Sequence, residues 1–181
     1  MQTKISIENL AQIQTELLAV FATDTQTAKG PDAKPQPVLL TSDEKVRSAA
    51  SSVLVTGEYK GGPNETVLLH APAGFAAKRL LIVGLGKKAK ATVHALRNAA
   101  GTAVRYTKPR AIRELTIALP EAVTEAGVTL AAEAAARAVA VGAFVGNFDA
   151  DTYRSEPRTR RRAQPRSPSR RRPPGGWIAR R

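Results

Sequence analysis

The sequence predicts an α/β fold, a three-layer sandwich in which helices cover both faces of a central mixed sheet. Short apolar runs of strand length alternate with segments of helical periodicity through most of the chain. The run at residues 80–83 is apolar at four consecutive positions, which is typical of a strand covered on both faces. Apolar residues make up 43% of the chain and aromatic residues only 4%, so Ala, Val, Leu and Ile must build the core.

Charge and composition divide the chain near its C-terminal end. Residues 1–154 carry 18 Lys and Arg against 14 Asp and Glu, whereas residues 155–181 carry 10 Arg and one Glu. The last segment is rich in Arg, Pro, Ser and Gly and has almost nothing to bury, so it cannot offset the entropy lost on ordering. We expect a folded domain in residues 1–156 and a disordered tail in residues 157–181.

The first half of the domain predicts strands at residues 17–21, 53–55, 66–70 and 79–83. Residues 28–37 have the Pro-rich, polar composition of a loop, and the sequence GEYKGGPN at residues 57–64 has that of a turn. Thr41, with Glu44 three residues later, predicts a capping box that opens a short helix ending near Ser51.

The second half predicts two helices and one strand. Thr92 can cap a helix whose apolar positions are Val93, Leu96, Ala100 and Ala103. Gly101 lowers the stability of that helix by about 1 kcal/mol relative to Ala, so we expect a close packing contact there.

Lys108-Pro109 should end the first of these helices, and a strand should follow at residues 114–119. An Ala-rich helix at residues 130–145 carries one apolar side. That side consists of Ala134, Ala138, Val141 and Val145.

Gly84-Leu85-Gly86 lies between a predicted strand and a predicted helix. Such a turn can bind phosphate through backbone N–H groups. However, the position at which the dinucleotide motif requires a third glycine is occupied by Ala89, and no acidic ribose partner follows at the expected distance. We therefore favour a structural strand-to-helix turn over a nucleotide site.

No other motif indicates catalysis or metal binding. Lys87, Lys88 and Lys90 suit a solvated loop better than a nucleic-acid contact. His70 and His94 have no His or Cys at metal-ligand spacing, and the chain has no cysteine. The two carboxylates of residues 149–151 are too few for a hard cation. We thus predict no catalytic, cofactor-binding or metal-ligating residue in this chain.

Three segments resemble the N-terminal domain of the leucyl (cytosol) aminopeptidase family, and their order along the chain agrees with that family. LLIVGLGKKAKATVHALRNAAGTAVR at residues 80–105 is similar to the family's strand, Val-Gly-Leu-Gly-Lys and helix. GEYKG at residues 57–61 resembles its Phe/Tyr-Lys-Gly turn. GNFD at residues 146–149 and YRSE at residues 153–156 resemble the stretch that leads into its catalytic domain.

The resemblance implies a macro-domain-like fold and a parent enzyme that removes N-terminal amino acids from peptides with two divalent metals, Zn or Mn. In that family the metal ligands and the catalytic Lys and Arg lie in a separate C-terminal domain, and the motif NTDAEGR that carries several of them is absent here. We expect the chain to end before that domain and to be inactive alone. The expected partners are the family's catalytic domain and further copies in a homo-oligomer.

A small basic module that binds nucleic acid or a nucleotide is the alternative function, and it depends on the tail. The tail is a nucleic-acid-binding arm with Trp177 as its one aromatic residue, a solvated extension, or the product of out-of-frame translation. All 10 of its basic residues are Arg, whereas the preceding residues use 10 Lys and 8 Arg. We favour the frameshift. No segment approaches the roughly 20 apolar residues of a membrane helix, and we expect a cytoplasmic protein.

The frameshift interpretation predicts a second reading frame that overlaps the codons of residues 156–162. Translated onward, this frame should give some three hundred residues in the family's usual pattern, including a close relative of NTDAEGR. Sequencing the downstream DNA checks this. If no such frame is present, the tail is genuine and its binding to nucleic acid should fall steeply with salt.

Overall fold

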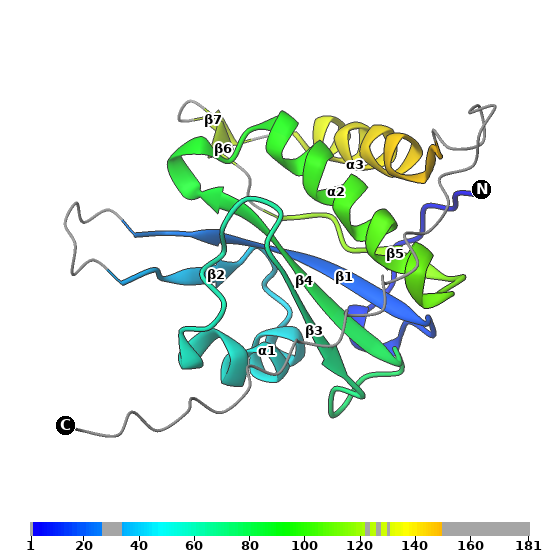
Figure 1. Ribbon diagram of the computed structural model, residues 1–181, viewed down its shortest axis with the longest axis horizontal. Coiled ribbons are helices and arrows are strands. Elements are labelled where there is room, and N and C mark those ends of the chain that lie inside the picture. The colour runs from blue at the N-terminus through cyan, green and yellow to red at the C-terminus, as the bar shows by residue number, and fades with distance from the viewer. Residues whose placement is uncertain (1, 27–33, 122–123, 126–127, 130, 150–181) are drawn as a thin grey trace, which may run out of the picture. The chain divides into compact units, whose positions relative to one another are not determined.

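A five-stranded mixed sheet forms the centre of the protein in the computed structural model (Figure 1). The structure describes residues 2–26, 34–121, 124–125, 128–129 and 131–149. One compact unit, Met1–Phe148, contains all the elements. The strands are β1 (Leu17–Asp24), β2 (Pro37–Leu39), β3 (Thr66–His70), β4 (Arg79–Lys87), β5 (Leu115–Ile117), β6 (Thr124–Glu125) and β7 (Val128–Thr129). The helices are α1 (Glu44–Thr56), α2 (Val93–Thr107) and α3 (Ala132–Asn147), with 3-10 turns η1 (Leu10–Gln12), η2 (Lys88–Lys90) and η3 (Lys108–Arg110).

Strand β1 is the axis of the sheet. One of its edges pairs in parallel with β4, and β3 pairs antiparallel with the far edge of β4. Its other edge is divided, because β5 pairs in parallel with Leu17–Ala19 and β2 pairs antiparallel with Ala22–Asp24. The predicted mixed sheet is confirmed, and its parallel strands are β5, β1 and β4.

Helices cover both faces of this sheet, as predicted. On one face, Val46 and Ala50 of α1 pack against a buried cluster that includes Leu18 and Ile82. On the opposite face, Leu96 of α2 packs against a cluster formed by the alternate residues of β1 and β4, and α3 packs on α2. All eight residues of β1 are buried, which explains why its sequence and that of β4 are apolar without alternation.

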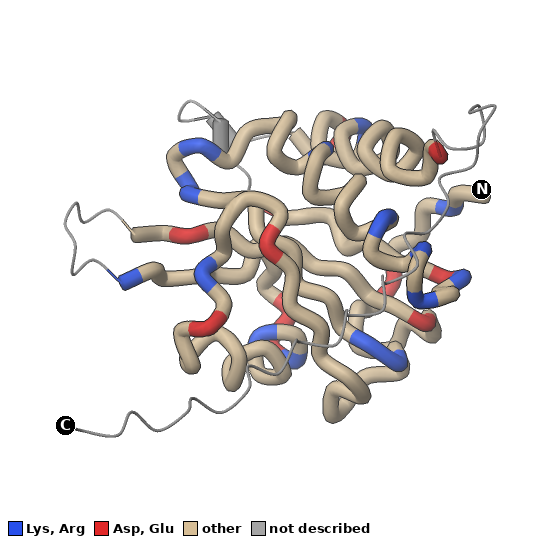
Figure 2. The backbone as a smooth tube through the Cα atoms, in the orientation of Figure 1, with Lys and Arg blue, Asp and Glu red and all other residues tan. Residues whose placement is uncertain are grey.

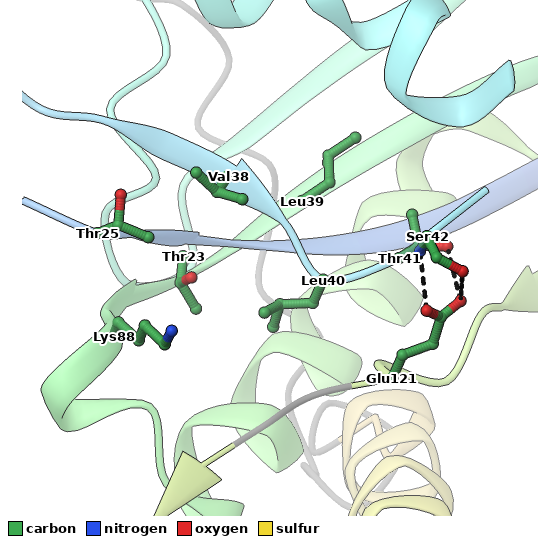
Figure 3. Close-up of a pocket in the computed structure, with 9 residues that line it drawn as sticks. All are labelled: Thr23, Thr25, Val38, Leu39, Leu40, Thr41, Ser42, Lys88 and Glu121. Carbon is green, nitrogen blue, oxygen red and sulfur yellow. Dashed lines mark hydrogen bonds between the residues drawn. The ribbon is translucent and has the colours of Figure 1, made fainter. Parts of the chain in front are cut away.

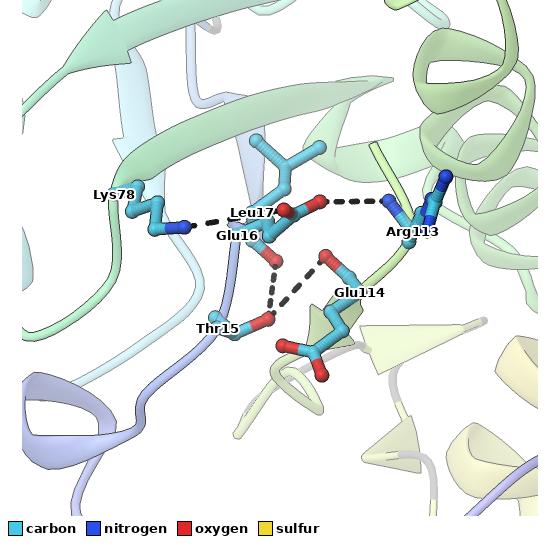
Figure 4. A network of polar contacts seen from close by, with 6 residues as sticks. All are labelled: Thr15, Glu16, Leu17, Lys78, Arg113 and Glu114. Atoms are coloured by element: carbon cyan, nitrogen blue, oxygen red, sulfur yellow. Dashed lines mark hydrogen bonds and ion pairs between the residues drawn. The ribbon is translucent and has the colours of Figure 1, made fainter. Parts of the chain in front are cut away.

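Polar contacts join the amino ends of the three parallel strands (Figure 4). The Glu16 carboxylate accepts a hydrogen bond from the Arg113 backbone N–H, 2.7 Å away, and lies 4.0 Å from the Lys78 ammonium. The Arg113 hydrogen bond, ahead of weaker contributions, holds the pKa of Glu16 below its usual value. Because residues 16, 78 and 113 precede β1, β4 and β5, this single carboxylate helps to align all three strands.

The structure corrects the expectations for residues 41–55. Helix α1 is capped by Asp43, whose side chain accepts from the Val46 N–H at 3.1 Å, so the predicted Thr41 capping box is wrong. The strand predicted at residues 53–55 is also wrong, because these residues form the last turn of α1, which ends at Gly57 with φ +76°. A three-residue apolar run suits a helix side as well as a strand, and packing decided between them.

The remaining predicted elements are confirmed in kind. Strands occur at residues 17–24, 66–70, 79–87 and 115–117, and helices at residues 93–107 and 132–147. Thr92 caps α2 by accepting from the Ala95 N–H at 3.3 Å.

The predicted loop at residues 28–37 ends in strand β2, and residues 27–33 lie outside the described part. The tail at residues 157–181 and the proposed boundary at residue 156 also lie outside it. No helix in the described residues is long and apolar enough to cross a membrane.

Glycines bring helices α2 and α3 into backbone contact. A Cβ atom added at Gly146 would lie 2.6 Å from the Gly101 carbonyl oxygen, and one at Gly142 would overlap the Arg97 carbonyl group. The close contact predicted at Gly101 is thus confirmed. Such an approach requires residues without a side chain on the facing sides of both helices.

Substitution Gly146→Ala should therefore destabilise the domain although Ala favours helices. We expect the free energy of unfolding to fall by about 1–3 kcal/mol, because the added methyl group forces the helices apart. Urea unfolding followed by circular dichroism measures the change. Arg137→Ala, at an exposed position of the same helix, should change it by less than about 0.5 kcal/mol. Equal or greater stability of Gly146→Ala would contradict the close packing.

Candidate interaction surface on the last helix

Helix α3 is apolar on two sides. Its inner side is buried against α2 and consists of Ala135, Ala138, Val139, Gly142, Ala143 and Gly146. Its outer side exposes Val141 by 41%, Phe144 by 57% and Val145 by 56%. The sequence placed Val141 and Val145 on one apolar side with Ala138, and the structure separates them, since Ala138 is buried and both valines are exposed.

Val141, Phe144 and Val145 form what we call the outer stripe. Their spacing of three and four residues places them next to one another on the helix surface. The only charged residues of α3, Glu133 and Arg137, lie in its first half, so its second half carries no charge (Figure 2). Contiguous exposed apolar side chains on an otherwise polar surface mark interaction sites.

Lys108 fixes the end of the helix that carries this stripe. Its ammonium donates to the Asn147 carbonyl oxygen at 2.8 Å and to the Phe148 carbonyl oxygen at 3.4 Å. A cation at this position satisfies terminal carbonyl groups and interacts favourably with the helix dipole. Helix α3, which carries the outer stripe, is therefore fixed in two ways. Glycine contacts hold its inner side against α2, and Lys108 binds the carbonyl groups at its end.

Gly84-Leu85-Gly86 is not a strand-to-helix turn. The three residues are buried within β4, and α2 begins only after η2. Gly84 donates to the Glu65 carbonyl at 2.8 Å and accepts from the Asn64 N–H at 2.8 Å, while a Cβ atom at Gly84 would overlap the Gly62 carbonyl oxygen. The glycines thus let the loop of residues 57–64 pack directly on the strand, which leaves no open phosphate cradle at this position.

The other residues singled out in the sequence lie on the surface. Lys87, Lys88 and Lys90 are exposed, as are His70 at the end of β3 and His94 in the first turn of α2. Within the described residues, no group of three or more His, Cys, Asp or Glu could hold a metal ion. Residues 150 and 151 lie outside the described part. That the chain has no catalytic or metal-ligating residue stays a prediction.

Comparison with known proteins identifies the class to which this domain belongs. Residues 18–157 match the family model of the cytosol aminopeptidase family, N-terminal domain. A probable cytosol aminopeptidase of Acidobacterium capsulatum is 49% identical over 160 residues, covering 86% of this chain and 31% of the relative. The chloroplastic leucine aminopeptidase of Solanum tuberosum is 31% identical over 166 residues, covering 86% of this chain and 27% of the relative.

A solved structure is also similar to this chain. The bottromycin maturation enzyme BotP in complex with Mn has a TM-score of 0.50 and 26% sequence identity, covering 78% of this chain and 25% of that one. The α/β domain with its apolar last helix therefore belongs to the cytosol aminopeptidase family, as its N-terminal domain. The chain spans about a third of the length of the relatives that it matches.

The family resemblance inferred from residues 57–61, 80–105 and 146–156 is confirmed. The outer stripe was not found in the sequence, although the spacing of Val141, Phe144 and Val145 was present there. Periodicity shows that residues share a side of a helix, but it does not show whether another element covers that side.

Proposed function

We propose that this chain serves as the non-catalytic domain of a leucyl aminopeptidase and that it does not hydrolyse peptides alone. The match of residues 18–157 to the family's N-terminal domain carries this proposal. The parent reaction is the metal-dependent release of N-terminal amino acids from peptides. The relatives are named as cytosol and leucine aminopeptidases, which supports the assignment of this reaction to the parent enzyme.

The partner that we propose for the outer stripe is the peptidase portion of the family protein. The stripe lies on the last turns of α3, and the family match ends at residue 157, ten residues after the helix. A portion that follows α3 is therefore tethered close to these apolar side chains. Covering Phe144 and its neighbours would bury apolar surface, at about 25 cal/mol for each Å². We also propose, from the family resemblance, that the assembled enzyme is a homo-oligomer.

Two divalent metal ions, Zn or Mn, would supply the activated water of the parent reaction. The Mn complex of BotP supports this part of the proposal. The described residues of this chain do not fit such a centre, because no three potential ligands lie together. We therefore assign the metals to the peptidase portion and no step of the reaction to this domain.

The alternative, a small basic module for nucleic acid or a nucleotide, finds no support in the described residues, where Gly84-Leu85-Gly86 lies packed within β4. Its charge comes from residues 155–181, and the residues before them carry a net charge of only +4. Cytoplasmic location stays part of the proposal. The name of the Acidobacterium capsulatum relative, a cytosol aminopeptidase, supports it, although the Solanum tuberosum relative is named as chloroplastic.

The first prediction of this proposal concerns activity. The purified chain should release no product from leucine anilides when Mn²⁺ or Zn²⁺ is added, because its described residues contain no two-metal centre to activate water. A colorimetric assay measures the release, with an intact cytosol aminopeptidase as the positive control. Metal-dependent turnover that survives repurification would overturn the proposal.

The second prediction concerns the partner of the outer stripe. The chain should co-purify with the peptidase portion of the Acidobacterium relative when the two are expressed as separate polypeptides. Phe144→Gln should weaken this association by at least about tenfold, since burial of a Phe side chain stabilises by roughly 1.5–3 kcal/mol. Val55→Gln, at an apolar position of α1 that is 84% exposed, is the matched control and should have no effect. Equal loss in both variants would contradict docking through α3.

A further inference from the structure

An open pocket lies at the carboxyl end of β1, on the face of the sheet that carries α2 (Figure 3). Its volume is about 300 Å³. Thr23 and Thr25 of β1 line it together with Val38 of β2 and Leu40, which follows β2. Thr23 pairs directly with Val38 across the two antiparallel strands, so their side chains lie on the same face of the sheet.

The topology explains why a pocket forms here. The connection that leaves the carboxyl end of β1 carries α1 on one face, whereas the connection that leaves β4 carries α2 on the other. Two adjacent parallel strands whose connections pass to opposite faces leave a crevice beyond their carboxyl ends, where α/β proteins bind ligands. Asp24 and Lys87, the last residues of β1 and β4, are paired across the two strands. Lys88, the next residue after β4, lines the pocket.

A fixed carboxylate lies on one side of the pocket. Glu121 Oε2 accepts from the Ser42 N–H at 2.9 Å, and Oε1 accepts from the Ser42 hydroxyl at 2.9 Å and from the Thr41 hydroxyl at 3.4 Å. The Glu121 backbone N–H donates to the Leu40 carbonyl at 3.0 Å. The Ser42 hydrogen bonds hold the pKa of Glu121 below its usual value, so the group is ionised at neutral pH. With three of its roughly four acceptor positions used, the carboxylate can accept one more donor.

A cation lies on the opposite side. Figure 3 shows Lys88 and Glu121 at two sides of the pocket with the Leu40 side chain between them. No hydrogen bond or ion pair of the Lys88 ammonium is found within the described residues. In the floor, the Thr23 hydroxyl is buried and has no hydrogen-bond partner, which is costly for a polar group. The pocket thus offers a cation, an anion and an apolar wall between them.

We propose that this pocket binds a small zwitterion with an apolar body, its ammonium group at Glu121 and its carboxylate at Lys88. Amino acids and short peptides with free ends share this chemistry. Val38 and Leu40 contact the apolar body, and rotation of the Thr23 side chain gives its hydroxyl a polar partner on the ligand. The site lies on the sheet, separate from the outer stripe of α3, and does not depend on the peptidase reaction.

The test is a titration of the full ¹⁵N-labelled chain followed by amide NMR. The probes are L-leucine, the dipeptide Leu-Leu, L-leucinamide, which lacks the carboxylate, and 4-methylpentanoate, which lacks the ammonium group. We expect L-leucine or Leu-Leu to shift the signals of Leu40, Ser42 and Lys88. The two probes with one charge should bind about tenfold more weakly, since each loses a charge-assisted hydrogen bond. Binding of Leu-Leu but not of leucine identifies a peptide site, and the reverse identifies an amino-acid site.

Two variants locate the binding. Lys88→Gln and Glu121→Gln should each weaken it by about tenfold for the same reason. Lys90→Gln, in the same turn but outside the pocket, and Glu58→Gln, an exposed acid elsewhere, are matched controls and should bind normally. If Glu121→Gln does not fold, Lys88→Gln decides, because Lys88 is exposed. The proposal is overturned if no probe shifts these signals, if singly charged probes bind equally well, or if Lys88→Gln and Lys90→Gln behave alike.

Discussion

Strands β1 and β4 pair in parallel with helices on both faces, and the other features of the domain depend on the burial of this pair. A parallel pair requires a crossover, and the crossovers of this chain bring α1 to one face and α2 to the other. With both faces covered, all eight residues of β1 are buried, among them Thr23, whose hydroxyl has no hydrogen-bond partner. The same crossovers open the crevice beyond the carboxyl ends of the strands. The core and the pocket therefore have one origin.

Small residues determine how the outer layer is built. Aromatic residues make up only 4% of the chain, so its helices pack through Ala and Gly and come close to each other. Gly101, Gly142 and Gly146 allow direct backbone contact between α2 and α3. The large apolar residues of α3 are on its other side, where Phe144 is 57% exposed. Because small residues are enough to pack the inner side of α3 against α2, the large apolar residues on its outer side are available to contact a partner.

Carboxylates that accept backbone N–H groups organise both ends of the sheet. Glu16 links the segments that precede three parallel strands, and Glu121 ties the chain after β5 to residues 41 and 42 before α1. Glu65 also accepts a backbone hydrogen bond, and it stabilises the glycine-rich loop of residues 57–64, since its carboxylate accepts from the Gly62 N–H at 2.8 Å. Glu121 differs from the other two, because it also borders an open pocket. The Glu121 carboxylate thus stabilises the fold through its hydrogen bonds and is also accessible to a ligand in the pocket.

The sequence by itself determined the α/β class, the strands around residues 17, 66, 80 and 115, helix α2 with its Thr92 cap, and the family. These features depend on local periodicity, capping and ordered motifs, all of which are written in consecutive residues. Tertiary structure alone decided that residues 53–55 extend a helix, that Gly84 lies within a strand, and that one side of α3 remains uncovered. It also brought Lys88 and Glu121 to one pocket. Each of these depends on which distant segment packs where, and a short apolar run or a charged residue carries no information about its distant neighbours.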